Sequence, residues 1–145
     1  MCSIAAPVLW RAAEALLSLS ESSPHWMSSV EEVEFFTSAD QHTLQMTVFV
    51  RKEPKGFSAL CDDLQQQLPE LAGAGVAVIE SEARGRKSFR IRAGSTWGKD
   101  GLNYIAGVES YWVSRGGFFQ VNRHMIDPLL DLVTHGKSGD LAWDL

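Results

Sequence analysis

Two side-chain amides follow a glycine turn late in the chain, close to two aromatic rings. Residues 111–122 read Y-W-V-S-R-G-G-F-F-Q-V-N, so the turn at 116–117 comes directly before the phenylalanines. An amide both donates and accepts hydrogen bonds without carrying charge, which suits contact with a polar ligand. The alternative is an amide buried in the fold and bonded to backbone groups. The residues concerned are Phe118, Phe119, Gln120 and Asn122.

The flanking residues predict a strand before this stretch and a helix after it. Residues 108–113 alternate as strands do, and apolar residues within 125–133 recur at helical spacing. Pro128 conflicts with one helix running from 121 to 135, because proline removes an interior hydrogen bond. We therefore expect the helix to start with Asp127 as its N-cap and Pro128 at its first position.

The last ten residues are typical of the beginning of a second unit. A turn at 136–139 leads into L-A-W-D-L at 141–145, which has the pattern of a buried first strand in a Rossmann-like unit. In such units a glycine-rich loop and a helix follow the strand. We therefore expect residues 1–135 to form one domain and residues 136–145 to begin the next, so that the chain is a segment of a larger enzyme.

The run S-R-G-G-F-F-Q-V-N, the helix after it and the D-L that ends the chain resemble the RNA uracil-5-methyltransferases, which make 5-methyluridine in tRNA and 23S rRNA. Those enzymes carry S-P-x-x-F-x-Q-V-N immediately ahead of their S-adenosylmethionine-binding domain. Arg115 stands where many members have proline. The resemblance implies that Gln120 contacts S-adenosylmethionine, with an uncharged amide beside a sulfonium, and that Phe118 and Asn122 form the wall of the same pocket.

A second similarity to this family lies near the start of the chain. Cys2, in C-S-I-A-A-P-V-L, resembles the fourth ligand of the iron–sulfur cluster that some members carry, although Ser3 replaces the usual proline. The family's chemistry uses a cysteine thiolate that adds to uracil and a carboxylate that removes a proton. Both groups would lie beyond Leu145. The resemblance therefore implies a central domain without catalytic residues, inactive by itself and with no cofactor bound.

Composition and charge describe an ordinary globular chain of 145 residues, 45% hydrophobic and 21% charged. No apolar run reaches the roughly 18 residues needed to cross a bilayer, and no signal-peptide pattern precedes the first helix. We therefore expect a cytoplasmic protein without a membrane partner or an obligate protein partner. The formal net charge of −5 argues against nucleic-acid binding over the whole surface.

One segment departs from this acidic balance, with five cations in nine residues. A strand over 87–92 would turn Phe89 and Ile91 inward and its cations largely outward. Charges on an edge strand can serve to prevent aggregation, or they can contact RNA phosphates. By the resemblance, the RNA would be tRNA or rRNA. The cations are Arg84, Arg86, Lys87, Arg90 and Arg92.

The remaining pattern predicts an α+β fold: a mostly antiparallel sheet with about three packed helices, truncated at the first strand of a Rossmann-like unit. Cys61 falls on the apolar face of a predicted helix, so we expect a buried packing residue. Residues 69–75 are expected to form a loop. Helices are predicted over 6–20 and 56–68, a hairpin over 30–36 and 43–50, and further strands over 76–82, 87–92, 102–106 and 108–113.

A different class of function also fits these residues. The chain could be a freestanding α+β nucleic-acid-binding or interaction module that shares only the short motif, with the basic strand as its contact surface. The coding sequence distinguishes the two, because a glycine-rich continuation after Leu145 would support the methyltransferase.

Overall fold

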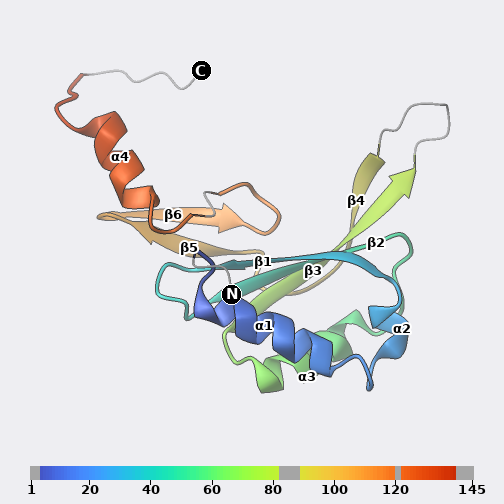
Figure 1. Ribbon diagram of the computed structural model, residues 1–145. Coiled ribbons are helices and arrows are strands. Elements are labelled where there is room, and N and C mark those ends of the chain that lie inside the picture. Colours follow the sequence, from blue (N-terminus) through green and yellow to red (C-terminus); the bar gives the residue numbers. More distant parts are fainter. Residues whose placement is uncertain (1–3, 82–88, 120–121, 140–145) are drawn as a thin grey trace.

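The chain folds into a four-stranded sheet with helices on one face, followed by a separate hairpin and helix. The computed structural model describes residues 4–81, 89–119 and 122–139 (Figure 1). The fold is α+β, as predicted. In chain order the elements are α1 (Pro7–Ser18), α2 (Pro24–Met27), β1 (Val30–Thr37), β2 (Leu44–Val50), α3 (Phe57–Gln67), β3 (Leu71–Ser81), β4 (Phe89–Gly98), β5 (Gly101–Ala106), β6 (Glu109–Ser114) and α4 (Ile126–Thr134).

The helices α1 and α3 cover one face of the sheet because each carries an apolar stripe. In α1 the buried residues are Val8, Ala12 and Leu16, spaced four apart, and Pro7 at the first helical position lacks only an N–H that would have no partner there. In α3 the buried residues include Cys61 and Leu64. Both predicted helices and the buried Cys61 are confirmed, and together with β2 and β3 they form the main core.

The four strands lie in the order β1-β2-β3-β4, and all neighbours are antiparallel except β2 and β3. The predicted hairpin of β1 and β2 is confirmed. The loop predicted over residues 69–75 is wrong, because β3 already begins at Leu71 and contains Gly73 and Gly75. These glycines allow side chains from other elements to lie directly on the strand, a use that sequence patterning does not reveal.

The β3–β4 pair extends as an arm past the helices (Figure 1). Ile91 on this arm is 61% exposed, so the predicted inward orientation of Ile91 is wrong. The alternation of the strand is correct, but no helix covers this end of the sheet. The burial of Phe89 and the structure of 82–88 lie outside the described residues. Strand β4 lies at an edge of the sheet. The interpretation of its charges as protection against aggregation requires this position.

The β5–β6 hairpin and α4 form a smaller second cluster. The hairpin turns at Gly107, whose φ of 59° favours glycine. Helix α4 begins at Ile126, so the predicted start with Asp127 as N-cap is wrong. Pro128 is tolerated because it still lies in the first turn, where N–H groups have no intrahelical partner. The Asp127 carboxylate instead accepts a hydrogen bond from the Gly107 N–H at 3.0 Å, which ties α4 to the hairpin.

Among the residues that the structure describes, none of the helices is both long enough and apolar enough to span a bilayer.

Candidate functional site

The Gly-Gly turn after β6 delivers Phe119 into a cluster of aromatic rings. Gly116 has a φ of 71°, and the Gly117 N–H donates to the Ser114 carbonyl at 2.9 Å, which closes the turn. The ring centroid of Phe119 lies 4.6 Å from that of Tyr104 and 5.6 Å from that of Phe36. Because Phe36 belongs to β1, the ring of Phe119 connects the four-stranded sheet to the hairpin.

The predicted ligand residues lie beside this anchor. Gln120 itself lies outside the described residues. Phe118 is 88% exposed, so its ring has no packing role within the described part of the chain. Asn122 is half-buried, and its side-chain oxygen accepts a hydrogen bond from the His124 N–H at 3.2 Å. The Asn122 carbonyl also accepts from the Met125 N–H at 2.9 Å, so Asn122 organises the chain entering α4.

An open hollow of about 400 Å³ is lined by the Gly-Gly turn and by Gln45 and Thr47 of β2. These two residues alternate with Leu44, Met46 and Val48, which pack in the core with α1 and α3, so the hollow lies on the opposite face of the sheet. Residues of β1 and β2 line it on one side and the segment from Ser114 to Phe119 on the other. Volumes of this size are typical of small-molecule pockets. The lining residues are Glu34, Phe35, Phe36, Gln45, Thr47, Ser114, Arg115, Gly116, Gly117, Phe118 and Phe119.

Gln45 is the most buried polar group in this hollow, with 2% of its surface exposed. Its side-chain Nε2 donates to the Gly101 carbonyl at 3.0 Å. Its Oε1 has no hydrogen-bond partner among the described residues. The amide lies against Gly73, where a Cβ would approach Nε2 to 2.8 Å. Glycine at position 73 is therefore what leaves room for Gln45.

Arg115 provides the positive charge of the hollow. Its side chain is 14% exposed and lies over Gly75, where a Cβ would overlap the guanidinium. One guanidinium nitrogen donates to the Lys99 carbonyl at 3.2 Å. The counter-ion is Asp100 at 3.5 Å, which is 84% exposed, so water screens much of this attraction. Sequence reasoning treated Arg115 only as a turn residue and gave no role to Gln45.

The cationic strand is described in part. Arg90 and Arg92 lie on β4 with exposed side chains, as predicted. The guanidinium of Arg92 is paired with Glu80 on β3 at 2.8 Å. The other predicted cations, Arg84, Arg86 and Lys87, lie outside the described residues.

Cys61 carries a thiol that could in principle act as a nucleophile, but its side chain is buried in the core. Burial raises the pKa of the Cys61 thiol to about 12, and the neighbouring Asp62 charge adds to the shift, so Cys61 is a poor nucleophile. The described residues contain no group of three or more potential metal ligands. Cys2, the predicted cluster ligand, lies outside those residues.

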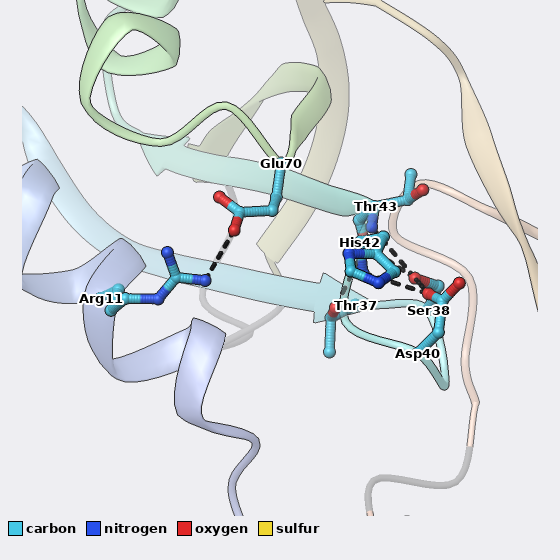
Figure 2. A network of polar contacts seen from close by, with 7 residues as sticks. All are labelled: Arg11, Thr37, Ser38, Asp40, His42, Thr43 and Glu70. Atoms are coloured by element: carbon cyan, nitrogen blue, oxygen red, sulfur yellow. Dashed lines mark hydrogen bonds and ion pairs between the residues drawn. The ribbon is translucent and has the colours of Figure 1, made fainter.

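A polar network at the ends of β1 and β2 also serves the fold (Figure 2). The Ser38 hydroxyl donates to the Asp40 carboxylate at 2.6 Å, and this bond lowers the pKa of Asp40. Arg11 of α1 pairs with Glu70 at 2.6 Å and lowers the pKa of Glu70. These contacts fix a turn and tie α1 to the start of β3.

No protein-family profile matches this sequence, and no curated protein matches it. The fold resembles part of one solved RNA methyltransferase. That structure is the tRNA (uracil-54, C5)-methyltransferase of Pyrococcus abyssi in complex with S-adenosyl-L-homocysteine, one of the solved structures to which this chain is similar, and it superposes with a TM-score of 0.64 at 13% identity. The match covers 90% of this chain and 32% of that enzyme, so the chain spans about a third of the enzyme's length. At this identity the similarity establishes the fold alone.

Proposed function

We propose that the chain is the central domain of an S-adenosylmethionine-dependent RNA uracil-5-methyltransferase, with residues 136–145 beginning the cofactor-binding domain. In this role the chain positions RNA and cofactor and carries no catalytic residue. The substrate is tRNA or rRNA. The observation that carries the proposal is the fold shared with an RNA methyltransferase over 90% of the chain, together with the F-F-Q-V-N run that the resemblance singles out.

The arrangement around the motif supports a cofactor role for Gln120, Phe118 and Asn122. Phe119 holds the segment in the aromatic cluster, and Asn122 fixes the turn into α4. Phe118 is left exposed between these two anchors. In our proposal Phe118 and Asn122 line the S-adenosylmethionine pocket, and Gln120 contacts the cofactor from the same segment.

The apolar surface near this segment supports a neighbouring domain. Large apolar side chains exposed on one part of a fold are typical of an interaction surface. In our proposal the cofactor-binding domain covers them. The exposed residues on the hairpin, the motif and α4 are Ile105, Val108, Tyr111, Trp112, Phe118, Met125, Leu129, Leu132 and Val133.

An iron–sulfur cluster held by Cys2 is the weaker part of the resemblance. A cluster needs four ligands, and the described part of the chain offers no group of three or more side chains that could supply them. Cys2 lies outside the described residues, and no part of the proposal depends on a cluster.

Calorimetry with S-adenosylmethionine tests the proposal. We expect the 145-residue chain alone to show no measurable affinity, because Gln120, Phe118 and Asn122 would form one wall of a pocket whose other wall belongs to the cofactor-binding domain. Tight binding by the isolated chain would contradict the assignment of these residues to a shared pocket.

A freestanding nucleic-acid-binding module is the second candidate, and the projecting β3–β4 arm with exposed Arg90 and Arg92 favours it. The two candidates differ in the coding sequence after residue 145. A glycine-rich continuation supports the methyltransferase, and its absence supports the module.

Both candidates predict that the arm contacts RNA phosphates. Replacing Arg90 by Gln should weaken binding of a tRNA transcript and lower the slope of log affinity against log salt by about 1. Arg11→Gln is the matched control, because Arg11 lies on α1 in the helical layer and is exposed. Equal slopes for wild type and Arg90→Gln, measured by filter binding from low to moderate salt, would assign the charge of Arg90 to edge protection instead.

A further inference from the structure

We propose that the β5–β6 hairpin and α4 form one unit that swings away from the four-stranded sheet about a hinge at Lys99 and Asp100, with Arg115 as the latch. This hinged unit comprises residues 101–119 and 122–134. The structure has the latched arrangement. Opening uncovers the β1 and β2 residues that line the hollow of about 400 Å³. The evidence is the packing within the chain, and it does not depend on the proposed function.

The hinged unit has a hydrophobic core of its own. The buried members of this core all belong to the unit, whereas the sheet and its helices share a different core. Among the described residues, Phe36 of β1 is the side chain of the sheet that packs against the smaller core. A unit with its own core and limited contact with the rest of the chain can move as a rigid body. The buried members are Leu102, Tyr104, Ala106, Val113 and Ile126.

In the described part of the chain, the backbone passes between the sheet and the hinged unit once, from β4 to β5. On the sheet side, the Lys99 N–H donates to the Ala72 carbonyl of β3 at 2.8 Å. On the other side, the Asp100 carbonyl accepts from the Arg115 N–H at 2.7 Å, next to the first residue pair of the β5–β6 hairpin. Rotation of the backbone between these two bonds breaks neither of them. Hinges of this kind need only a few residues that absorb the change in backbone angles.

The boundary between the sheet and the hinged unit is loosely packed. Three hollows, of about 80, 400 and 140 Å³, are each lined by residues from both sides. Tyr104 of the unit lines two of them, together with Ala39 from the turn between β1 and β2. Protein interiors normally have few voids larger than a water molecule. Empty space along the boundary therefore lowers the cost of separating the two sides, because fewer contacts are lost.

Arg115 crosses this boundary with a charged side chain. It follows β6, and its guanidinium lies over Gly75 of β3, where the side chain is 14% exposed. One guanidinium nitrogen donates to the Lys99 carbonyl at 3.2 Å. Gln45 of β2 adds a second link, because its Nε2 donates to the Gly101 carbonyl at 3.0 Å. Hydrogen bonds from charged donors are the stronger kind, so we expect the loss of Arg115 to favour opening.

The ring of Phe36 is the apolar part of the latch. Its centroid lies 5.6 Å from that of Phe119 and 5.9 Å from that of Tyr104. Opening separates Phe36 from both rings, whereas the pair of Tyr104 and Phe119, at 4.6 Å, stays within the hinged unit. Phe36 therefore offers a second contact that can be weakened without changing Arg115.

In the proposed methyltransferase, the same movement would carry the cofactor segment. Phe118 and Asn122 belong to the hinged unit, so opening moves them away from β1 and β2. The hollow widens when the unit opens and closes again around a bound group when the latch re-forms.

Double electron–electron resonance on the 145-residue chain tests the hinge. The two spin labels are attached to the exposed positions of the variants Glu32→Cys on β1 and Leu132→Cys on α4, with Cys2→Ser to remove a competing thiol. Cys61 is buried and stays unlabelled. We expect a main short distance and a minor longer one. Arg115→Met should raise the ratio of the longer to the shorter distance about tenfold, because a hydrogen bond from a charged group is lost.

Matched variants locate the latch. Arg92→Met is the control, because this arginine also contacts a carboxylate, that of Glu80 at 2.8 Å, but within the β3–β4 arm. Phe36→Leu should raise the longer-distance fraction as Arg115→Met does. A single short distance that stays unchanged in both latch variants, or an equal change in Arg92→Met, would overturn the proposal. If Arg115→Met fails to fold, Phe36→Leu on the same labelled chain still decides.

Methyl NMR spectra distinguish a hinge from unfolding of the unit. The signals of Leu102 and Val113, two buried members of the smaller core, should keep their folded positions in Arg115→Met. Random-coil positions would overturn the proposal, because the unit would then unfold instead of swinging. Neither measurement involves RNA or S-adenosylmethionine, so failure of the hinge and failure of the proposed function give separate results.

Discussion

Replacing Gly73 by Ala is expected to lower the free energy of unfolding by about 3 kcal/mol, at the upper end of the range for overpacking. A Cβ at this position would overlap the Lys99 carbonyl oxygen and would lie 2.8 Å from both amide atoms of Gln45. The Gln45 side chain can move, but the backbone of Lys99 is fixed by its N–H, which donates to the Ala72 carbonyl at 2.8 Å. Urea unfolding followed by circular dichroism measures the change.

Gly107→Ala is the matched control for this substitution. Gly107 has a φ of 59°, and nothing lies within 4 Å of the position of its Cβ. The control therefore measures only the strain of placing alanine in the left-handed region, about 1 kcal/mol. A loss for Gly73→Ala no larger than that of Gly107→Ala would show that Gln45 and Lys99 do not pack against Gly73 as described.

Gly73 also shows where sequence patterning fails. Local composition reads a glycine-rich segment as a loop, because glycine weakens strands and favours turns. Residues 71–75 nevertheless form a strand, paired with β2 and β4, and glycines stand in it because Gln45 and Arg115 occupy the space above Gly73 and Gly75. Gln45 is 28 residues before Gly73, and Arg115 is 40 residues after Gly75. The need for glycine therefore cannot be seen in the sequence immediately around these positions.

The helices and hairpins can be predicted because the sequence pattern that defines each of them lies within the element itself. An apolar stripe at helical spacing defines α1 and α3, and alternation defines β1 and β2. The same alternation correctly separates the two faces of β4 but does not say whether another layer covers either face. Ile91 is exposed for this reason, because covering a strand depends on the length and placement of distant helices.

The candidate site was predictable only in part. The motif residues stand out by their spacing, but Gln45 has no sequence signal beyond being a polar residue within a mostly apolar strand. Its importance comes from the unpartnered Oε1 and from the Gly101 carbonyl, which is 56 residues away. Arg115 likewise becomes informative only when its guanidinium is seen over Gly75.

The same substitution at the two adjacent phenylalanines should have very different effects on stability. Phe119→Ala is expected to lower the free energy of unfolding by about 2 kcal/mol, less than for a fully buried phenylalanine because Phe119 is only partly buried. It removes ring contacts with Tyr104 at 4.6 Å and Phe36 at 5.6 Å between centroids. Phe118→Ala should change the free energy by less than about 0.5 kcal/mol, because its ring is exposed.

This pair separates an anchor from a contact residue. If Phe119 fixes the segment between the sheet and α4, its loss should also broaden the NMR signals of residues that follow the turn, and Phe118→Ala should leave them sharp. Equal stability losses for the two variants in urea would mean that Phe118 packs within the chain, which would remove it from the proposed cofactor pocket. A stability cost confined to Phe119 leaves Phe118 free to serve a ligand or a neighbouring domain, because an exposed aromatic ring that adds nothing to the fold has no structural reason to be at this position.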